Sequence, residues 1–126
     1  MGFGNSNNHR GGQRKALDMN TSTIPNLEKL LGGPRDGPLL RYALGNEWLK
    51  AGDANKAVEH LRAAVAANPG YSAAWKSLGK ALTASGAETE ALSAYEQGIE
   101  AAHARGDVQA AKEMTVFARR LRRKAG

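Results

Sequence analysis

The sequence predicts an all-α fold made of antiparallel helical hairpins. Alanine is abundant and runs of the strand-forming residues Val, Ile and Thr are missing, a composition that favours helices. Apolar residues recur at the three- and four-residue spacing of one helical face, and glycines interrupt that spacing at regular positions. The stretch from Trp75 to Leu82 has a counterpart 34 residues earlier. A pattern that is used twice predicts a repeated structural unit.

The chain is expected to hold one helical domain, residues 24–124, after a disordered tail, residues 1–23. The tail is rich in Gly, Asn, Ser and Arg and has almost nothing to bury, which is the composition of a segment without a core. The 126 residues suffice for one domain of modest core. Met19 is an alternative natural start, in which case residues 1–18 come from upstream sequence.

A short helix is expected to lead the domain. Thr23 is its expected cap and Pro25 lies in its first turn, while Gly32-Gly33-Pro34 ends it. Such a short helix must dock on the helices that follow, because it is not stable alone. Its apolar face is predicted to consist of Ile24, Leu27, Leu30 and Leu31.

Two hairpins are predicted next, over about residues 38–71 and 72–105. Gly52 and Gly86 separate the two helices of each hairpin, and Ser72 is expected to cap the first helix of the second one. Glycines and apolar positions recur in the same phase, which chance would rarely give. The pairs at an offset of 34 residues are Leu44/Leu78, Gly45/Gly79, Gly52/Gly86 and Ala57/Ala91, with Leu61/Tyr95 and Val65/Ile99 similar in kind.

The last predicted helix, residues 107–124, has no partner helix. Asp107 is its expected cap. A lone amphipathic helix after two hairpins is typical of the cap that covers the exposed core at the end of a repeat array. Its apolar stripe is predicted to contain Ala110, Met114, Phe117 and Leu121.

The repeated unit resembles the tetratricopeptide repeat, whose pattern is Trp-x-x-Leu-Gly-x-x-Tyr, then Ala-x-x-x-Phe, then Pro. The resemblance covers residues 38–105. The first unit departs from the pattern at Arg41, which replaces the usual Trp and makes this unit similar to the exposed edge of an array; the second departs at Leu82 and His103. The matching residues are Leu44, Gly45, Ala57 and Pro69 in the first unit and Trp75, Leu78, Gly79, Ala91 and Tyr95 in the second.

The chain as a whole is also similar to small bacterial proteins that consist of two such repeats with a helix at each end. The likeness lies in the runs from Tyr71 to Lys80 and from Arg105 to Leu121. Since that group has no firmly assigned activity, this resemblance implies a fold rather than a function.

In the tetratricopeptide family the first helices of successive hairpins line a concave groove that holds peptides, and the resemblance implies the same here. Family members that bind the acidic tails of heat-shock chaperones use an Asn in one repeat and two bases in the next, and Asn46, Lys76 and Lys80 stand at matching positions. Two ammonium groups and an amide can chelate a terminal carboxylate. That clamp also draws on a preceding repeat, and Tyr42 stands where one of its lysines is expected. The predicted groove residues are Tyr42, Asn46, Leu49, Lys76, Lys80 and Thr83.

The predicted function is therefore protein–protein interaction, with a peptide or an acidic tail held in this groove. The alternative is a structural role in which copies pair weakly, through the edge at Arg41 or through the capping helix. A third interpretation, binding of nucleic acid or an anionic surface, rests on the basic cluster of the last helix. We do not favour it, because bases at a helix C-terminus also stabilise the helix dipole and no aromatic residue interleaves this cluster to stack on bases. The cluster consists of Arg119, Arg120, Arg122, Arg123 and Lys124.

The charge distribution also disfavours nucleic-acid binding by the whole domain. The net charge of +6 divides into +2 over residues 1–23, zero over 24–105 and +4 over 106–126, so the repeat body is neutral and does not suit a domain-wide nucleic-acid binder.

The sequence favours neither an enzyme nor a cofactor protein. It has no cysteine, which excludes disulfides and thiolate metal sites. His9, His60 and His103 lie far apart in the sequence and form no ligand pair, and no glycine-rich phosphate loop is present. We expect no catalytic residue, no metal and no cofactor. No apolar run is long enough to span a membrane, and a cytoplasmic location is the expectation.

Overall fold

The computed structural model describes residues 23–126, which form helices and turns without a strand. A short helical segment over residues 23–28 leads the chain, so Thr23, the expected cap, is itself helical. Predictions for residues 1–22, including the disordered tail and the alternative start at Met19, lie outside the described residues. The helices that follow are α2 (Pro38–Lys50), α3 (Ala54–Ala67), α4 (Ser72–Ala84), α5 (Glu88–Arg105) and α6 (Val108–Ala125).

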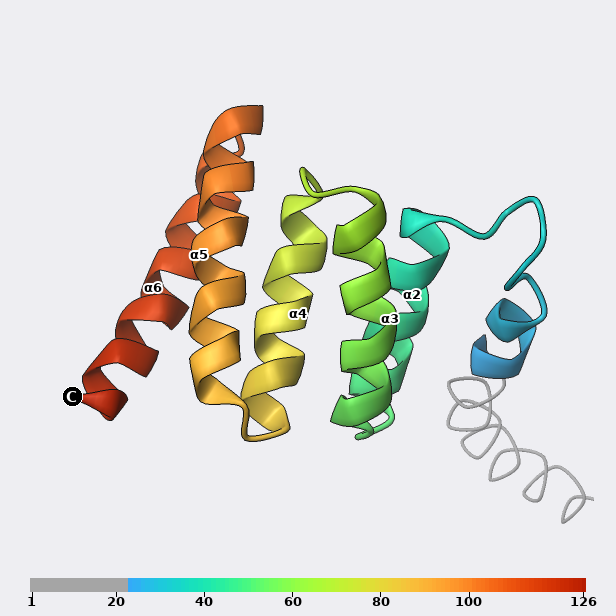
Figure 1. The fold of residues 1–126 in the computed structure, drawn as a ribbon, viewed down its shortest axis with the longest axis horizontal. Helices are drawn as coiled ribbons and strands as arrows, with labels where there is room; N and C mark the ends of the chain where they lie inside the picture. The colour runs from blue at the N-terminus through green and yellow to red at the C-terminus, as the bar shows by residue number, and fades with distance from the viewer. Residues whose placement is uncertain (1–22) are drawn as a thin grey trace, which may run out of the picture.

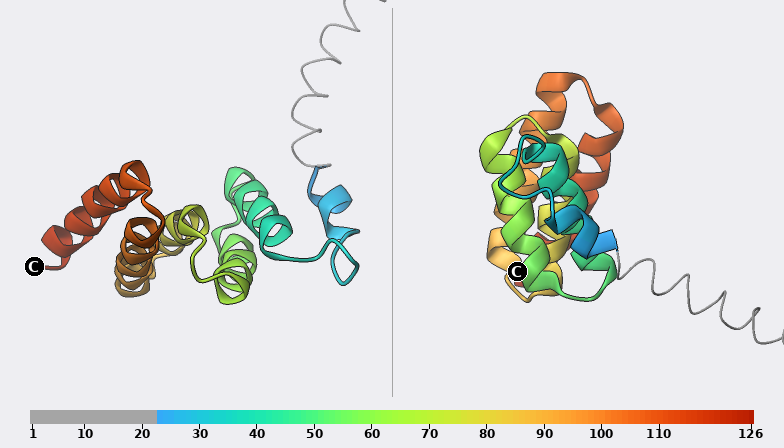
Figure 2. Two further views of the ribbon diagram at one scale, coloured as in Figure 1. Left: turned by 90° about the horizontal axis from the view of Figure 1, so that it is seen from above. Right: turned by 90° about the vertical axis from the view of Figure 1, so that its right-hand side faces the viewer.

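The helices stand side by side in chain order, each antiparallel to the one before it (Figure 1). Seen from above, α2, α4 and α6 form one row and α3 and α5 the other (Figure 2). The pairs α2/α3 and α4/α5 are the two predicted hairpins, and α6 packs mainly on α5 and touches α4. The predicted all-α array of two hairpins, flanked by a short leading helix and a capping helix, is confirmed.

Glycine ends the first helix of both hairpins in the same conformation. Gly52 and Gly86 both have φ of +87°, a region that is open to glycine at little cost. In each case the amide of the residue directly after the glycine donates back to the helix. Asp53 donates to the Trp48 carbonyl and Ala87 to the Leu82 carbonyl, both at 2.9 Å. These bonds satisfy carbonyls that a helix end leaves open. The 34-residue period of the sequence is therefore a period of turn geometry as well.

Glycines inside the helices mark the points of closest packing. A methyl group at Gly45 would lie 2.7 Å from Cδ2 of Leu61, and one at Gly79 would lie 2.7 Å from Cδ1 of Tyr95. The third such position, Gly98 in α5, was not predicted; its missing side chain makes room for Met114 of α6. In all three cases the glycine and the side chain above it are 16 residues apart.

The core consists of three apolar clusters in a row. The central cluster joins α3, α4 and the start of α5, the C-terminal cluster joins α5 and α6, and the N-terminal cluster joins the leading segment to α2. Trp48 packs against the N-terminal and central clusters, and Trp75 against the central and C-terminal clusters. The Trp75 indole also donates to the Pro69 carbonyl at 2.7 Å. Each tryptophan thus lies at a junction between neighbouring clusters.

The leading segment covers the outer side of α2. Ile24 is buried together with Leu40 and Leu44. Arg41, which the sequence suggested as an exposed edge, donates to both carboxylate oxygens of Asp36, at 3.0 and 3.1 Å. Asp36 in turn accepts the Gly32 amide at 2.8 Å. The first hairpin therefore does not present a bare edge at Arg41.

The helix caps agree with the sequence in part. Asp107 accepts the amide of Ala110 at 3.1 Å, as predicted for the cap of α6, and Asp53 caps α3 in the same way. The prediction that Ser72 caps α4 is wrong. The N-cap residue is Tyr71, and Ser72 is buried with its hydroxyl 3.4 Å from the Asp107 carboxylate.

Candidate functional site

The six predicted groove residues lie on two neighbouring helices. Tyr42, Asn46 and Leu49 belong to α2, whereas Lys76, Lys80 and Thr83 belong to α4. Because α4 contacts both α2 and α6, the last helix extends this row (Figure 2). We call the side of these helices that carries the six predicted residues, together with Glu113, Phe117 and Arg120 of α6, the α2–α4–α6 face.

Lys76 is bound by a carboxylate of the chain itself. Its ammonium donates to Oε1 of Glu113 in α6 at 2.7 Å, and Gln109 donates to the other oxygen, Oε2, at 3.2 Å. The hydrogen bond from Lys76, followed by that from Gln109, holds the pKa of Glu113 below its ordinary value. The side chains of Lys76 and Glu113 remain 28% and 39% exposed. The lysine that the sequence singled out for a partner's carboxylate is thus oriented by an internal one.

Lys80 is exposed and reaches over α6. Its ammonium lies 5.7 Å from the centre of the Phe117 ring, and the Arg120 guanidinium lies 5.9 Å from the same ring, both within the range of a cation–π contact. Thr83, one turn further along α4, donates its hydroxyl to the Gly79 carbonyl at 2.8 Å. Thr83, Phe117 and Arg120 line a hollow of about 170 Å³ between the helices.

The α2 part of this face is more apolar. The Tyr42 ring packs against that of Tyr71 with centroids 4.9 Å apart, and burial raises the pKa of the Tyr71 phenol. Asn46 and Leu49 are half-buried. Leu39, in the first turn of the same helix, is 71% exposed. This end therefore offers aromatic and aliphatic contacts rather than charge.

Sequence reasoning missed the contribution of α6. Glu113, Phe117 and Arg120 complete the face beside Lys76 and Lys80, yet none was among the predicted site residues. The sequence signal for these residues was the apolar stripe of the last helix, because residues on and beside such a stripe are candidates for contact with a neighbouring helix. Which flank meets α4 depends on how α5 and α6 pack.

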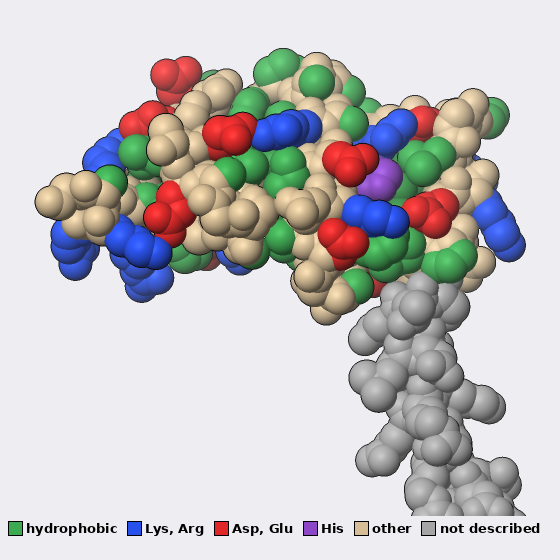
Figure 3. Space-filling model, turned by 60° about the horizontal axis from the view of Figure 1, so that its bottom comes forward, with side chains coloured by type: hydrophobic (Ala, Val, Ile, Leu, Met, Phe, Trp, Pro, Cys, Tyr) green, Lys and Arg blue, Asp and Glu red, His purple; other side chains and the backbone are tan. Residues whose placement is uncertain are grey.

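The basic cluster of α6 is partly engaged in ion pairs. Arg122 donates to Glu96 and Lys124 to Glu88, both at 2.7 Å and both to α5. These two pairs fasten the end of α6 to the preceding helix. Figure 3 shows Lys and Arg side chains gathered at the end of the molecule where α6 ends, while both signs of charge mix over the rest of the visible face.

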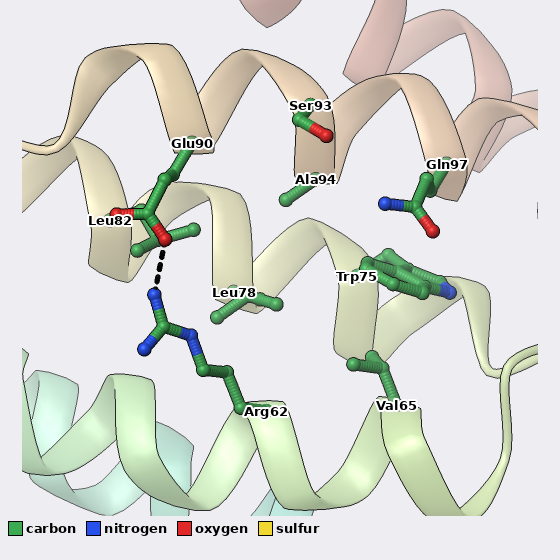
Figure 4. Close-up of a pocket in the computed structure, with 9 residues that line it drawn as sticks. All are labelled: Arg62, Val65, Trp75, Leu78, Leu82, Glu90, Ser93, Ala94 and Gln97. Carbon is green, nitrogen blue, oxygen red and sulfur yellow. Dashed lines mark hydrogen bonds and ion pairs between the residues drawn. The ribbon is translucent and has the colours of Figure 1, made fainter.

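A second hollow lies among α3, α4 and α5 (Figure 4). Trp75, Leu78 and Leu82 of α4 form its floor (Figure 4). Arg62 of α3 makes an ion pair with Glu90 of α5 across its mouth, with the two side chains 53% and 61% exposed. The hollow, about 230 Å³ in volume, is a shallow gap between two hairpins that this ion pair bridges.

The described residues hold no cluster of side chains that suits a metal ion. Among residues 23–126, no three His, Asp or Glu side chains come together as metal ligands. His60 is half-buried rather than directed outward, with its Nδ1 buried and unpaired; burial, and then the charge of Arg41, lowers its pKa. No helix in this part of the chain has the length and apolar character that a membrane crossing requires.

The chain is similar to known tetratricopeptide proteins. The family model described as tetratricopeptide repeat matches residues 49–114. The TPR repeat-containing protein PA0015 of Pseudomonas aeruginosa is 52% identical over 100 residues, which are 79% of this chain and 95% of that protein.

Solved structures agree with this relationship. Protein BPP2914 from Bordetella parapertussis superposes with a TM-score of 0.69 and 44% identity, over 80% of this chain and 88% of that one. The Sgt2 TPR domain from Aspergillus fumigatus superposes with a TM-score of 0.74 and 27% identity, over 92% of this chain and 76% of that one. The family is typical of interaction modules rather than of enzymes. By sequence and by fold, this chain belongs to the tetratricopeptide repeat family.

Proposed function

We propose that this protein binds a protein partner by holding an acidic segment, together with its terminal carboxylate, along the α2–α4–α6 face. The observation that carries the proposal is the contact of Lys76 with Glu113 at 2.7 Å. This is the length of a charge-assisted hydrogen bond. The position already binds one carboxylate, so its geometry suits another.

An incoming carboxylate would take the place of Glu113. Lys76 and Glu113 are both partly exposed, and solvent weakens such an ion pair, so the exchange of one carboxylate for another costs little. Lys80, one turn away and exposed, is a second cation for the same acidic segment. Asn46 adds an amide donor on the neighbouring helix. The apolar residues of α2 are the proposed contacts for the preceding part of the peptide: Leu39, Tyr42 and Leu49.

The test compares two short fluorescein-labelled peptides that end in consecutive aspartates, one with a free C-terminal carboxylate and one amidated. Fluorescence anisotropy should show tighter binding of the free carboxylate. Lys76→Glu should weaken that binding about tenfold or more while the helix content, from circular dichroism, stays unchanged. Lys29→Glu makes the same change of charge on the leading segment and serves as the matched control. Equal binding by Lys76→Glu and Lys29→Glu would remove the proposed site.

A second variant tests the competition. Glu113→Gln removes the internal negative charge and keeps a side chain of the same shape, so the aspartate peptide should bind more tightly than to the unaltered protein. Weaker binding to Glu113→Gln would mean that Glu113 orients Lys76 without competing for its ligand.

Weak self-association stays an alternative prediction. Its first proposed contact, the edge at Arg41, is less favoured because Asp36 and the leading segment cover it. Analytical ultracentrifugation at two concentrations tests it, since an average mass that rises with concentration shows pairing and an unchanged monomer mass contradicts it. A cytoplasmic location stays part of the proposal.

A further inference from the structure

The open end of the array carries a groove that the proposed function does not use. It lies between α5 and α6 and has a volume of about 450 Å³. The groove, which we call the end groove, is lined by His103 of α5 and by Val108, Lys112, Thr115, Val116 and Arg119 of α6, with Ala111 also on its wall. Neither Glu113 nor Phe117, which face α4, is among these residues.

The end groove is open because α6 has no following helix in the described part of the chain. In α2 and α4 the corresponding side is covered by the second helix of the hairpin, which places Leu61 over Gly45 and Tyr95 over Gly79. Each of these glycines lies eight residues after the N-cap residue of its helix, and so does Thr115 in α6. The end groove therefore occupies the place where a further helix would pack.

The surface left open is apolar. Val108 is 59% exposed and Val116 is 43% exposed, and together with Leu39 they are the exposed large hydrophobic residues of the part of the chain described. Two of these three side chains thus line one groove. Apolar side chains gathered in a concave surface are typical of an interaction site.

The charge of the end groove has one sign. Its ionisable lining residues are His103, Lys112 and Arg119, and no acid lines it. Lys112 and Arg119 are its cationic side chains. An apolar groove flanked by cations is complementary to an apolar stripe flanked by carboxylates.

We infer that the end groove binds an amphipathic helix of another protein, one that carries an aliphatic stripe flanked by Asp or Glu. The aliphatic stripe packs on Val108, Ala111 and Val116, and the acids pair with Lys112 and Arg119. Thr115 stands where the hairpins have glycine, so this helix lies farther from α6 than α5 lies from α4. Such a helix in a groove is a general mode of recognition.

Charge disfavours other occupants. A second copy that docked its own end groove here by two-fold symmetry would place bases against bases. Residues 1–23 carry a net charge of +2, which is the wrong sign as well. Single-stranded nucleic acid needs aromatic side chains on which bases stack, and none lines the groove.

The test uses the full chain and a designed helical peptide labelled with fluorescein, which has Leu at one-turn spacing and Glu on both flanks. Its matched control has Lys in place of every Glu. Anisotropy should show saturable binding of the Glu peptide, at least about tenfold tighter than that of the Lys peptide. Val116→Asp, and separately the double variant Lys112→Glu/Arg119→Glu, should each weaken binding about tenfold or more. Lys29→Glu, which makes the same change of charge on the exposed leading segment and outside both surfaces, should leave it unchanged.

Several results would overturn the inference: no saturable binding of the Glu peptide, equal binding of the two peptides, or an equal loss in Lys29→Glu. Sedimentation without peptide adds another, because dimers abolished by Val116→Asp would make a second copy the occupant. Displacement of the peptide by an oligothymidine would point to nucleic acid and also overturn it. Failure at the end groove leaves the aspartate-peptide test untouched, because the two surfaces share no residue.

Discussion

Replacement of Gly79 by alanine tests the close packing within the second hairpin. The added methyl group would lie 2.7 Å from Cδ1 of Tyr95, nearer than real side chains come. Tyr95 cannot move away freely, since it is only 3% exposed and its ring lies 5.4 Å from that of Phe117. One of the two helices must therefore shift.

Two opposing effects set the size of the change. Overpacking of a well-filled core costs about 1–3 kcal/mol, whereas alanine favours a helix by about 1 kcal/mol over glycine. The free energy of unfolding should therefore fall by up to about 2 kcal/mol, the overpacking cost less the helical gain. For a domain of this size each kcal/mol lowers the melting temperature by about 4–8 °C.

Urea unfolding followed by far-ultraviolet circular dichroism measures this loss. A double-mutant cycle with Tyr95→Leu isolates its cause, because the smaller side chain leaves room for the methyl group. Gly79→Ala should cost less in the Tyr95→Leu background than in the unaltered chain. A stability that rises with Gly79→Ala, or the same loss in both backgrounds, would refute the argument.

Three further predictions concern polar contacts. Asp107→Ala and Asp53→Ala each remove a side-chain cap and should each lower the free energy of unfolding by about 1 kcal/mol in urea titrations, whereas no change would show the caps to be dispensable. The pKa of Glu113 is lowered in the folded chain. The stabilising effect of this carboxylate is therefore present above its ordinary pKa of 4.5 and is lost as the pH falls through the lower pKa of the folded chain. The difference in melting temperature between the unaltered chain and Glu113→Gln should shrink on acidification, and a growing difference would contradict the prediction. Arg62→Gln breaks an exposed pair with Glu90 and should change stability by less than about 1 kcal/mol, as thermal melts at low and high salt can check.

The sequence predicted most of the fold because its signals are local. Apolar periodicity, Gly52 and Gly86 located the hairpins, and Asp107 located the start of the last helix. Ser72 failed as a cap because serine suits both a helix start and a small buried position, and the contact with Asp107 that decides between them joins residues far apart in the sequence.

The candidate site was less predictable, because it depends on how helices cross. Lys76 was expected to be available, and only the packing of α6 shows that Glu113 binds it. Likewise, Arg122 and Lys124 were part of a basic cluster in the sequence, but acids of α5 pair with them. Gly98 could have been recognised, since Met114 follows it at the same 16-residue separation as in the other glycine contacts.

The two tryptophans are the only ones in the chain, and each lies where two apolar clusters meet. This placement makes their fluorescence a natural reporter of where the array first comes apart. In a Trp48→Phe variant the remaining indole senses opening at the C-terminal junction, and in a Trp75→Phe variant it senses opening at the N-terminal one. Neighbouring repeats interact mainly with each other, so the two emission signals can separate in time, and their order of change would tell which end of the array frays first.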